Sequence, residues 1–318
     1  MASATPKTLI EAVRYFEDPD VCNAFMAELR WPTGVTCPTC GAAEPRYIAT
    51  RRLWECKTKH PKKQFSVKVG TIFEDSPISL DKWLTAVWLI ANAKNGISSY
   101  ELERAIGVTQ TTAWFMLHRI RLAMQSGDFD RPMGGQVEVD ETFIGGKARF
   151  MHKGKRAAKI TGTGGAGKEA VMGLLERHGP DGHSIVRTKH VASRRRHTLA
   201  PVVRQNVTPG SEVFSDALGS YSGLKADFIH GVIDHAEKHV EGQIHTNGIE
   251  NFWSLLKRAL KGTYVSVEPF HLFRYLDEEA FRFNERHKSD AGRFVAVLKA
   301  AVGRRLTYDE LRGKGIPA

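Results

Sequence analysis

The pattern of hydrophobic and polar residues divides the chain into three regions. The first, to about Glu74, is rich in turn residues and holds all four cysteines. From Leu80 to Met124, apolar residues recur at spacings of three and four, which predicts helices. The turn-rich segment Ser126–Gly135 follows, and we interpret it as a linker. We therefore predict an N-terminal module over residues 1–75, a helical module over 76–130 and a third domain over 131–318.

The third region begins with strand-like patterns. Val137 and Val139 alternate with Glu138 and Asp140, which is the period of a half-buried strand. Three further apolar runs have strand character, with a helical pattern before the last: Ala170–Glu176, Ser184–Ala192 and Ser211–Ala217. The period is helical again from Ile249 to Asn284. This order predicts a mixed α/β domain.

The helical region contains two helices separated by a glycine turn. Ser98 or Ser99 can cap the first helix, Gly107 can end it, and Thr109 can cap the second. This spacing is typical of a helix-turn-helix whose second helix binds DNA, with Arg119 and Arg121 reaching phosphates. A plain helical hairpin has the same spacing and remains an alternative. The residues expected to form the inner faces are Leu102, Ala105, Ile106, Val108, Trp114, Leu117 and Ile120.

Four residues of the first region have the spacing of a zinc site. Cys37 and Cys40 form a C-x-x-C motif, and Cys56 and His60 follow at C-x-x-x-H spacing. A tetrahedral zinc site takes four sulfur or nitrogen ligands, often as two such pairs about 15–20 residues apart. The alternatives are a redox C-x-x-C or two unrelated buried thiols. A redox motif opens a helix, whereas Pro38 and Gly41 indicate a tight turn. We predict that these four residues bind one Zn²⁺ ion.

Three acidic residues occupy positions where the hydrophobic pattern does not lead us to expect an acid. Asp140 and Asp216 end apolar strands, and Glu250 opens a helix. Carboxylates placed in this way can converge and hold two Mg²⁺ or Mn²⁺ ions, and such a metal pair catalyses phosphoryl transfer. For any one of the three alone, a solvated acid at the end of a strand or helix is the better explanation. The set, within a basic chain, favours a function.

The helix that follows Glu250 has a charged face. At 3.6 residues per turn, Glu250, Ser254, Lys257 and Lys261 align on one side. Two lysines beyond an acid would hold DNA phosphate beside the metal site, and we assign the neighbouring Arg258 to DNA as well. A solvated, salt-bridged face is the alternative, and from this feature alone it would be preferred.

Composition supports a polyanionic partner. The 46 Lys and Arg exceed the 35 Asp and Glu by 11, and the 42% hydrophobic content excludes a wholly disordered chain. Seven Lys or Arg and no acid occur in Lys147–Lys168, where we predict DNA contacts by Lys153, Lys155 and Arg156. The longest apolar stretch, Leu84–Ala93, is about half of what a membrane span needs. Glu11 interrupts any signal-peptide core, and four cysteines are too few for a disulfide scaffold, so we expect a cytoplasmic protein.

These motifs, in this order, resemble the bacterial insertion-sequence transposases of the ISXO2-like type, which carry an N-terminal zinc ribbon and a DDE core. The segments that carry the resemblance are RWPTGVTCPTCG, GTIFEDSPISLDKWLTAVWLI, GVTQTTAWFMLHRIR, VEVDETFIGGK, FSDALGSY and HTNGIENFWSLLKR. The resemblance implies an α/β fold with a ribonuclease H-like (retroviral-integrase-like) catalytic core, preceded by a zinc ribbon and a helix-turn-helix. It implies catalytic roles for Asp140, Asp216, Glu250 and Lys257, with Asn247 or Asn251 as alternatives for the variable third residue. His60 departs from the family's usual second cysteine pair.

The function implied is that of a DDE-type DNA transposase, a polynucleotidyl transferase. It would cut the ends of an insertion sequence and join the freed 3′-hydroxyl to target DNA, and we expect it to act as a homo-oligomer on DNA. One alternative is a DNA-binding transcriptional regulator, which leaves about 180 residues after the linker without a purpose. The other is a metal-dependent nuclease that cuts without joining.

Overall fold

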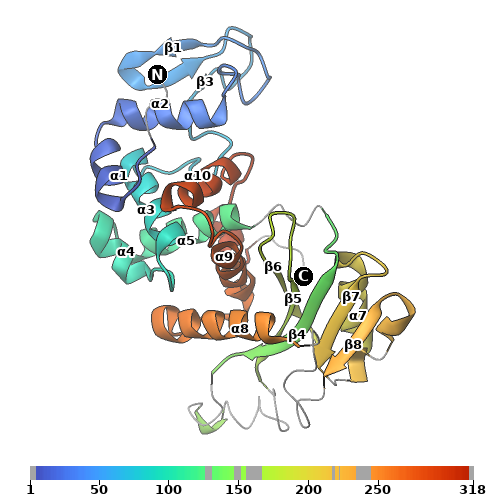
Figure 1. The fold of residues 1–318 in the computed structure, drawn as a ribbon. Coiled ribbons are helices and arrows are strands. Elements are labelled where there is room, and N and C mark those ends of the chain that lie inside the picture. Colours follow the sequence, from blue (N-terminus) through green and yellow to red (C-terminus); the bar gives the residue numbers. More distant parts are fainter. Residues whose placement is uncertain are drawn as a thin grey trace. The chain divides into compact units, whose positions relative to one another are not determined.

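The computed structural model describes residues 5–125, 131–146, 152–154, 167–216, 219–221, 223–233 and 245–314 (Figure 1). The chain forms two compact units, one made of residues 1–125 and 285–318 and the other of residues 126–284. Each unit is described by itself. No helix in the described ranges has the length and apolar character that crossing a membrane requires.

The first unit is built from helices that pack around large aromatic side chains. Trp83 and Trp88 of α3 are almost completely buried, and Phe294 of α10 packs against Trp88 with ring centroids 5.1 Å apart. Most of these helices begin at a Ser, Thr or Asp that accepts a backbone N–H, the usual N-cap. The helices are α1 (Leu9–Tyr15), α2 (Pro19–Arg30), α3 (Leu80–Asn92), α4 (Ser99–Ile106), α5 (Gln110–Met124), α10 (Asp290–Ala300) and α11 (Tyr308–Leu311).

A small antiparallel sheet belongs to the same unit. Its strands are β1 (Arg46–Ile48), β2 (Leu53–Glu55) and β3 (Gln64–Phe65), with the 3₁₀ turn η1 (Ala49–Arg51) between the first two. Trp54 of β2 pairs with both Tyr47 and Phe65, and it is buried against Trp31. Aromatic packing of this kind stabilises a sheet too small to stand alone.

The predicted domain boundary at the C-terminus is wrong. Residues 285–318, which we expected to belong to the third domain, are part of the first unit. The Ile72 N–H donates to the Ala301 carbonyl, and Thr71 forms a β-bridge with Val302. These partners are far apart in the sequence, so no local pattern marks the boundary.

The two-helix prediction is confirmed as local structure. Ser98 caps α4 in a capping box with Glu101, Gly107 ends it in the left-handed conformation at φ +62°, and Thr109 caps α5. Leu102 and Ile106 are buried as expected, whereas Ala105 is exposed, so its assignment to the inner face is wrong. Whether the pair binds DNA stays a prediction.

Two predicted DNA contacts in α5 are wrong. Arg119 is only 5% exposed, and its guanidinium donates to the backbone carbonyls of Ile72, Glu74 and Leu306. Arg121 is 1% exposed. Both side chains are enclosed by the first unit, so neither is available to a phosphate.

The second unit contains a five-stranded sheet in the order β6-β5-β4-β7-β8. β4 pairs antiparallel with β5 and parallel with β7, β5 pairs antiparallel with β6, and β7 pairs parallel with β8. Four of these strands match the sequence prediction, and β8 was missed. The strands are β4 (Gln136–Ile144), β5 (Glu169–Glu176), β6 (Ile185–Val191), β7 (Glu212–Asp216) and β8 (Ile229–Ile233).

Helices cover both faces of this sheet (Figure 1). Val137, Val139 and Val213 point to one face and pack with Leu199 and Val203 of α7. On the other face, Val171, Leu175 and Val186 pack with apolar residues of α8 and α9. The remaining elements are α7 (Arg196–Asn206), η4 (Gly219–Tyr221), η5 (Leu224–Ala226), α8 (Asn247–Ala259), the π-helical turn η6 (Leu260–Tyr264), η7 (Pro269–His271) and α9 (Leu272–Asn284).

Candidate functional site

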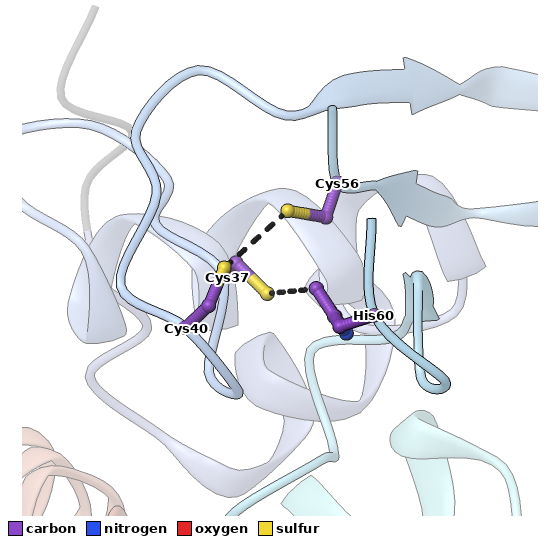
Figure 2. A group of neighbouring side chains, drawn as sticks. All are labelled: Cys37, Cys40, Cys56 and His60. Carbon is purple, nitrogen blue, oxygen red and sulfur yellow. Dashed lines mark hydrogen bonds between the residues drawn. The ribbon is translucent and has the colours of Figure 1, made fainter. Parts of the chain in front are cut away.

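The four predicted zinc ligands converge in the first unit. Cys37 Sγ lies 3.4 Å from His60 Nε2, and Cys40 Sγ lies 3.6 Å from Cys56 Sγ (Figure 2). All four ligand atoms lie within 4.8 Å of one another. Sulfur and nitrogen ligands of a tetrahedral zinc ion are separated by about 3.5–3.8 Å, given their bond lengths to the metal. The donor set and spacing therefore fit one Zn²⁺ ion.

Local backbone structure holds these ligands in place. The Cys37 N–H donates to the Ala42 carbonyl and the Gly41 N–H to the Cys37 carbonyl, which closes a knuckle turn with Gly41 at φ +74°. Cys56 follows β2 directly, and its N–H donates to Lys63. Burial raises the pKa of the Cys37 thiol, but hydrogen bonds from the backbone N–H groups of Cys40 and Thr39 outweigh it and lower that pKa to about 6. A thiolate at neutral pH is the form that binds zinc.

Asp140 and Asp216 are brought together by the parallel pairing of β4 and β7. The register places Val139 beside Ser215, so the next residues on the two strands are Asp140 and Asp216. Both side chains are half-buried. Asp216 ends β7 as predicted, whereas Asp140 lies in the middle of β4, which continues to Ile144, so the prediction that Asp140 ends its strand is wrong. The expected convergence of these two carboxylates is observed, and their catalytic role stays a prediction.

The third member of this acidic group is Glu141, which the sequence analysis missed. One oxygen of each of Asp140, Glu141 and Asp216 lies within 4.8 Å of the other two. Tyr221 of η4 donates its hydroxyl to Glu141 Oε1 at 2.6 Å. Strand alternation directs Glu141 to the face opposite Asp140, so periodicity gives no reason to group them. The adjacent acid in the VEVDE sequence was the available signal.

Burial and neighbouring negative charges raise the pKa values of Asp140 and Glu141. Burial raises the pKa of Asp140 to about 6, and the charges of Asp216 and Glu250 add to the effect. Burial raises the pKa of Glu141 to about 7, with Asp140 and Asp216 adding and the Tyr221 hydrogen bond opposing. Divalent cations relieve such repulsion, and their preferred ligands are carboxylate oxygens. The residues present therefore fit Mg²⁺ or Mn²⁺.

Glu250 lies outside the 4.8 Å group but within electrostatic reach of it. Its charge contributes to the raised pKa of Asp140. The side chain is exposed in the first turn of α8, where Glu250 Oε1 accepts from Thr246 Oγ1 at 2.8 Å. Asn247 and Asn251, the alternative third residues, are also exposed on α8.

Lys257 of α8 lies within electrostatic reach of Asp140. Burial lowers the pKa of Lys257, the charge of Asp140 opposes this, and Lys261 and Lys168 lower it further. These electrostatic effects indicate a basic group beside Asp140. The face predicted as one continuous helix is interrupted, because α8 ends at Ala259 and Lys261 lies in the π-helical turn.

Helix α8 is joined to the site by Trp253. Its Nε1 donates to Asp140 Oδ2 at 2.9 Å. The six-membered ring lies over Gly173, the residue opposite Asp140 on β5, so closely that a Cβ there would be 2.6 Å from Trp253 Cζ2. Glycine at position 173 thus permits the approach of α8 to the sheet.

A second attachment lies at the N-terminus of α8. Glu138, 1% exposed and two residues before Asp140, accepts the Ile249 N–H at 2.8 Å. The same carboxylate accepts from Arg177 Nε at 2.8 Å, and Arg177 also donates to the His245 carbonyl at 2.7 Å. A Cβ at Gly248 would lie 2.9 Å from Glu138 Oε2. This network fixes the helix that carries Glu250 against the strand that carries Asp140.

The structure describes three of the five other residues that the sequence predicts to contact DNA. Lys153, Arg258 and Lys261 are exposed, as a DNA contact requires. Lys155 and Arg156 lie outside the described residues.

Two family models match the chain. The ISXO2-like transposase domain matches residues 132–284, which nearly coincides with the second unit, and the transposase zinc-ribbon domain matches residues 17–58. A protein in transposable element ISH50 of Halobacterium salinarum is 29% identical over 288 residues, covering 87% of this chain and 95% of that relative. A transposase-like protein of Haemophilus influenzae is 35% identical over 106 residues, covering 33% of this chain and 83% of that relative.

The chain belongs to the insertion-sequence transposases that combine this zinc ribbon with an ISXO2-like transposase domain. The resemblance seen in the sequence is thereby confirmed. The zinc-ribbon match ends at residue 58 and so includes the three cysteine ligands but not His60.

Proposed function

We propose that this protein is a DDE-type DNA transposase that cuts the ends of an insertion sequence and joins them to target DNA. The observation that carries the proposal is the convergence of Asp140 and Asp216 on two neighbouring parallel strands, just after the last pair of the β4–β7 ladder. Lys257 lies within electrostatic reach of Asp140, and the chain carries a net charge of +11. Membership of the transposase family supports DNA as the substrate.

We assign the catalytic unit to the ribonuclease H-like fold. Strands β6, β5 and β4 pair antiparallel, and β7 and β8 extend the sheet from β4 by parallel pairing. Helix α7 packs on one face of this sheet and α8 on the other, and this arrangement supports the assignment. The helix pair α4–α5 is the proposed helix-turn-helix. Its exposed Thr111 stands at the start of the second helix, where such motifs contact bases.

Asp140 and Asp216 would hold two Mg²⁺ or Mn²⁺ ions, with Glu250 or Glu141 as the third carboxylate. A metal pair about 3.5–4 Å apart activates the attacking oxygen and stabilises the leaving oxygen of an in-line displacement. Lys257 would bind the scissile phosphate and Asn247 would line the site. In the first step a water oxygen bonds to phosphorus as the bond to the 3′-oxygen breaks, and that oxygen leaves as a hydroxyl. In the second step this hydroxyl attacks a target phosphate and displaces another 3′-oxygen.

The partners are the element ends and the target DNA. Lys153, Lys155, Arg156, Arg258 and Lys261 would contact phosphates, and the zinc ribbon would assist end binding. We expect a homo-oligomer on DNA, because the two ends of an element must be joined together, acting in the cytoplasm where bacterial chromosomal DNA lies. A regulator without catalysis would not require the acidic group, and a nuclease that does not join is distinguished by its products.

The test is cleavage and joining of a labelled duplex that carries the inverted repeats flanking the gene, with Mg²⁺ and the full chain. Asp140→Asn and Asp216→Asn should abolish both reactions while end binding persists, because each keeps its shape but loses an anionic ligand. Comparing Glu250→Gln with Glu141→Gln identifies the third carboxylate. Lys257→Ala should be milder because lysine holds no metal.

Glu212→Gln is the matched control, since Glu212 lies on β7 four residues before Asp216 and binds Gln136. It should cleave like the unaltered protein. Full activity of the Asp140 variant would overturn the site assignment, and cleavage without joined products would identify a nuclease.

A further inference from the structure

Three consecutive arginines at the start of α7 have no part in the site described so far. Arg194, Arg195 and Arg196 are all exposed. Within the described parts of the chain, none of the three guanidinium groups forms an ion pair. Their combined positive charge is therefore not neutralised by the described fold.

The three arginine charges lie at the N-terminus of α7, where the helix dipole disfavours cations. Arg195 is the N-cap residue of α7, Arg196 begins the helix, and the first turn holds no acid. A cation near a helix N-terminus opposes the helix dipole, by about 0.3–1 kcal/mol each. Ser193 shapes the turn instead, since its hydroxyl accepts the Arg195 N–H and bonds Thr198 Oγ1 at 2.9 Å. Stability of the helix does not explain this run of arginines.

The run borders the acidic group. The Arg194 guanidinium lies over the Phe143 ring, 4.7 Å from its centroid, and Phe143 is two residues after Glu141 on the same face of β4. The charge of Arg194 acts on the Glu141 carboxyl. The turn η4 contacts both, because Ser220 donates to the Arg194 carbonyl and Tyr221 donates to Glu141.

Arg196 is held by the loop before η5. Its guanidinium lies against the backbone of Gly223, where an added Cβ would overlap it. Position 223 thus leaves room for this side chain. Arg194 contacts β4 and Arg196 contacts the β7–β8 connection, so two of the three cations are held in place by packing.

The geometry points to Arg194, Arg195 and Arg196 as a binding surface for the DNA phosphate backbone, on the α7 side of the acids. Lys257 and its basic neighbours border Asp140 from the α8 side. A strand whose scissile phosphate lies at the acids would thus meet cations on both sides. This inference rests on the proposed function and adds the surface that holds the strand beyond the scissile bond.

The test is binding of the full chain to a fluorescein-labelled duplex of mixed sequence, about three helical turns long, over a range of salt concentrations without divalent metal. Each phosphate contact contributes about 0.9 to the slope of log affinity against log salt. Arg194→Gln, Arg195→Gln and Arg196→Gln should each lower the slope by about that amount, and the triple variant by about 2–3. Arg204→Gln is the matched control on the same helix, because Arg204 Nε is paired with Asp227 Oδ2 at 2.7 Å, and its slope should not change.

Arg195→Lys tests whether the positive charge itself is responsible. This variant retains the charge and should show the salt dependence of the unaltered protein, whereas Arg195→Gln should show a smaller slope. An unchanged slope in the triple variant would overturn the inference, as would an equal loss with Arg204→Gln. Failure of the proposed function looks different: the unaltered protein would then cut no element end with Mg²⁺, whatever the salt slope. If both the proposed function and this inference are correct, the triple variant should cut element ends slowly when the protein concentration is too low to bind all the DNA. Its cleavage rate should then approach that of the unaltered protein once the DNA is saturated with protein.

Discussion

Replacing Gly173 with alanine tests whether the close approach of α8 to the sheet supports the site. The new methyl group would lie 2.6 and 2.7 Å from Trp253 Cζ2 and Cη2, and 2.7 Å from Ile249 Cδ1. Ordinary contacts of a Cβ begin near 3.4 Å, so the ring would have to retreat by about 0.8 Å. Ile249 and Trp253 are both buried in the α8-side core, so neither can move alone.

The magnitude follows from this overlap. Overpacking a closed core costs about 1–3 kcal/mol. A unit of about 160 residues loses about 2–4 °C of Tm per kcal/mol, so the transition of the second unit should fall by roughly 2–12 °C. The displaced ring also weakens the Trp253–Asp140 hydrogen bond, now 2.9 Å.

The effect on activity should exceed the effect on stability. Helix α8 carries both Glu250 and Lys257, and a misplacement of about 1 Å at a catalytic group can lower the rate about a hundredfold. We therefore expect cleavage by Gly173→Ala to fall by about one to two orders of magnitude at a temperature where the protein remains folded.

The assay pairs thermal unfolding with single-turnover cleavage. Gly134→Ala is the matched control, because a Cβ at Gly134 meets nothing within 4 Å and its φ is not positive. Trp253→Phe removes the N–H donor together with part of the ring that packs over Gly173, so it measures the loss of both contacts between α8 and the sheet. If Gly173→Ala kept both the Tm and the cleavage rate of the unaltered protein, the argument that glycine here sets the position of α8 would be refuted.

Three further outcomes are expected. The purified protein should contain about one zinc per chain, measured by metal analysis, and Cys37→Ser with Cys56→Ser should lose it, whereas His60→Cys should retain it because a fourth sulfur also suits zinc. Glu138→Gln should destabilise the second unit by about 3–5 kcal/mol in denaturant unfolding, because the buried Arg177 guanidinium loses its ion pair with this carboxylate; an unchanged midpoint would contradict this. The pKa values of Asp140 and Glu141, raised to about 6 and about 7, mean that the metal-free fold binds their protons more tightly than the unfolded chain does. Their contribution to stability is therefore present below about pH 4 and is lost as the pH rises through 6 to 7, so Mg²⁺ should raise the Tm more at about pH 8 than at about pH 5, and Asp140→Asn should reduce that difference.

Local periodicity predicted those parts of the fold that depend on neighbouring residues. The alternation around Val137 and Val139 gave β4, and the Ser98, Gly107 and Thr109 signals gave the ends of α4 and the start of α5. The cysteine spacing predicted a cluster that is present. The strand β8 was missed because Gly231 interrupts its short pattern and Ile229, at 63% exposure, faces solvent at the sheet edge.

The errors concern contacts between distant residues. Arg119 has the sequence context of a surface cation, yet its partners are carbonyls 45 to 187 residues away. The place of Glu141 in the acidic group depends on the end of β7 at Asp216 and on Tyr221, 80 residues further on. Within the candidate site, sequence therefore identified Asp140 and Asp216 as neighbours but could not identify which third carboxylate lies closest.

The return of the C-terminal segment to the first unit sets an order for folding during synthesis. The second unit is one continuous segment, so every residue of its sheet has been made by residue 284. The first unit lacks Phe294 and the Ala301 carbonyl until the last residues emerge, although its own N-terminus was made first. A nascent chain would therefore complete its second unit, with the acidic group, before the unit that contains the cysteine cluster. A late stop codon would leave an intact sheet tethered to an unfinished helical core.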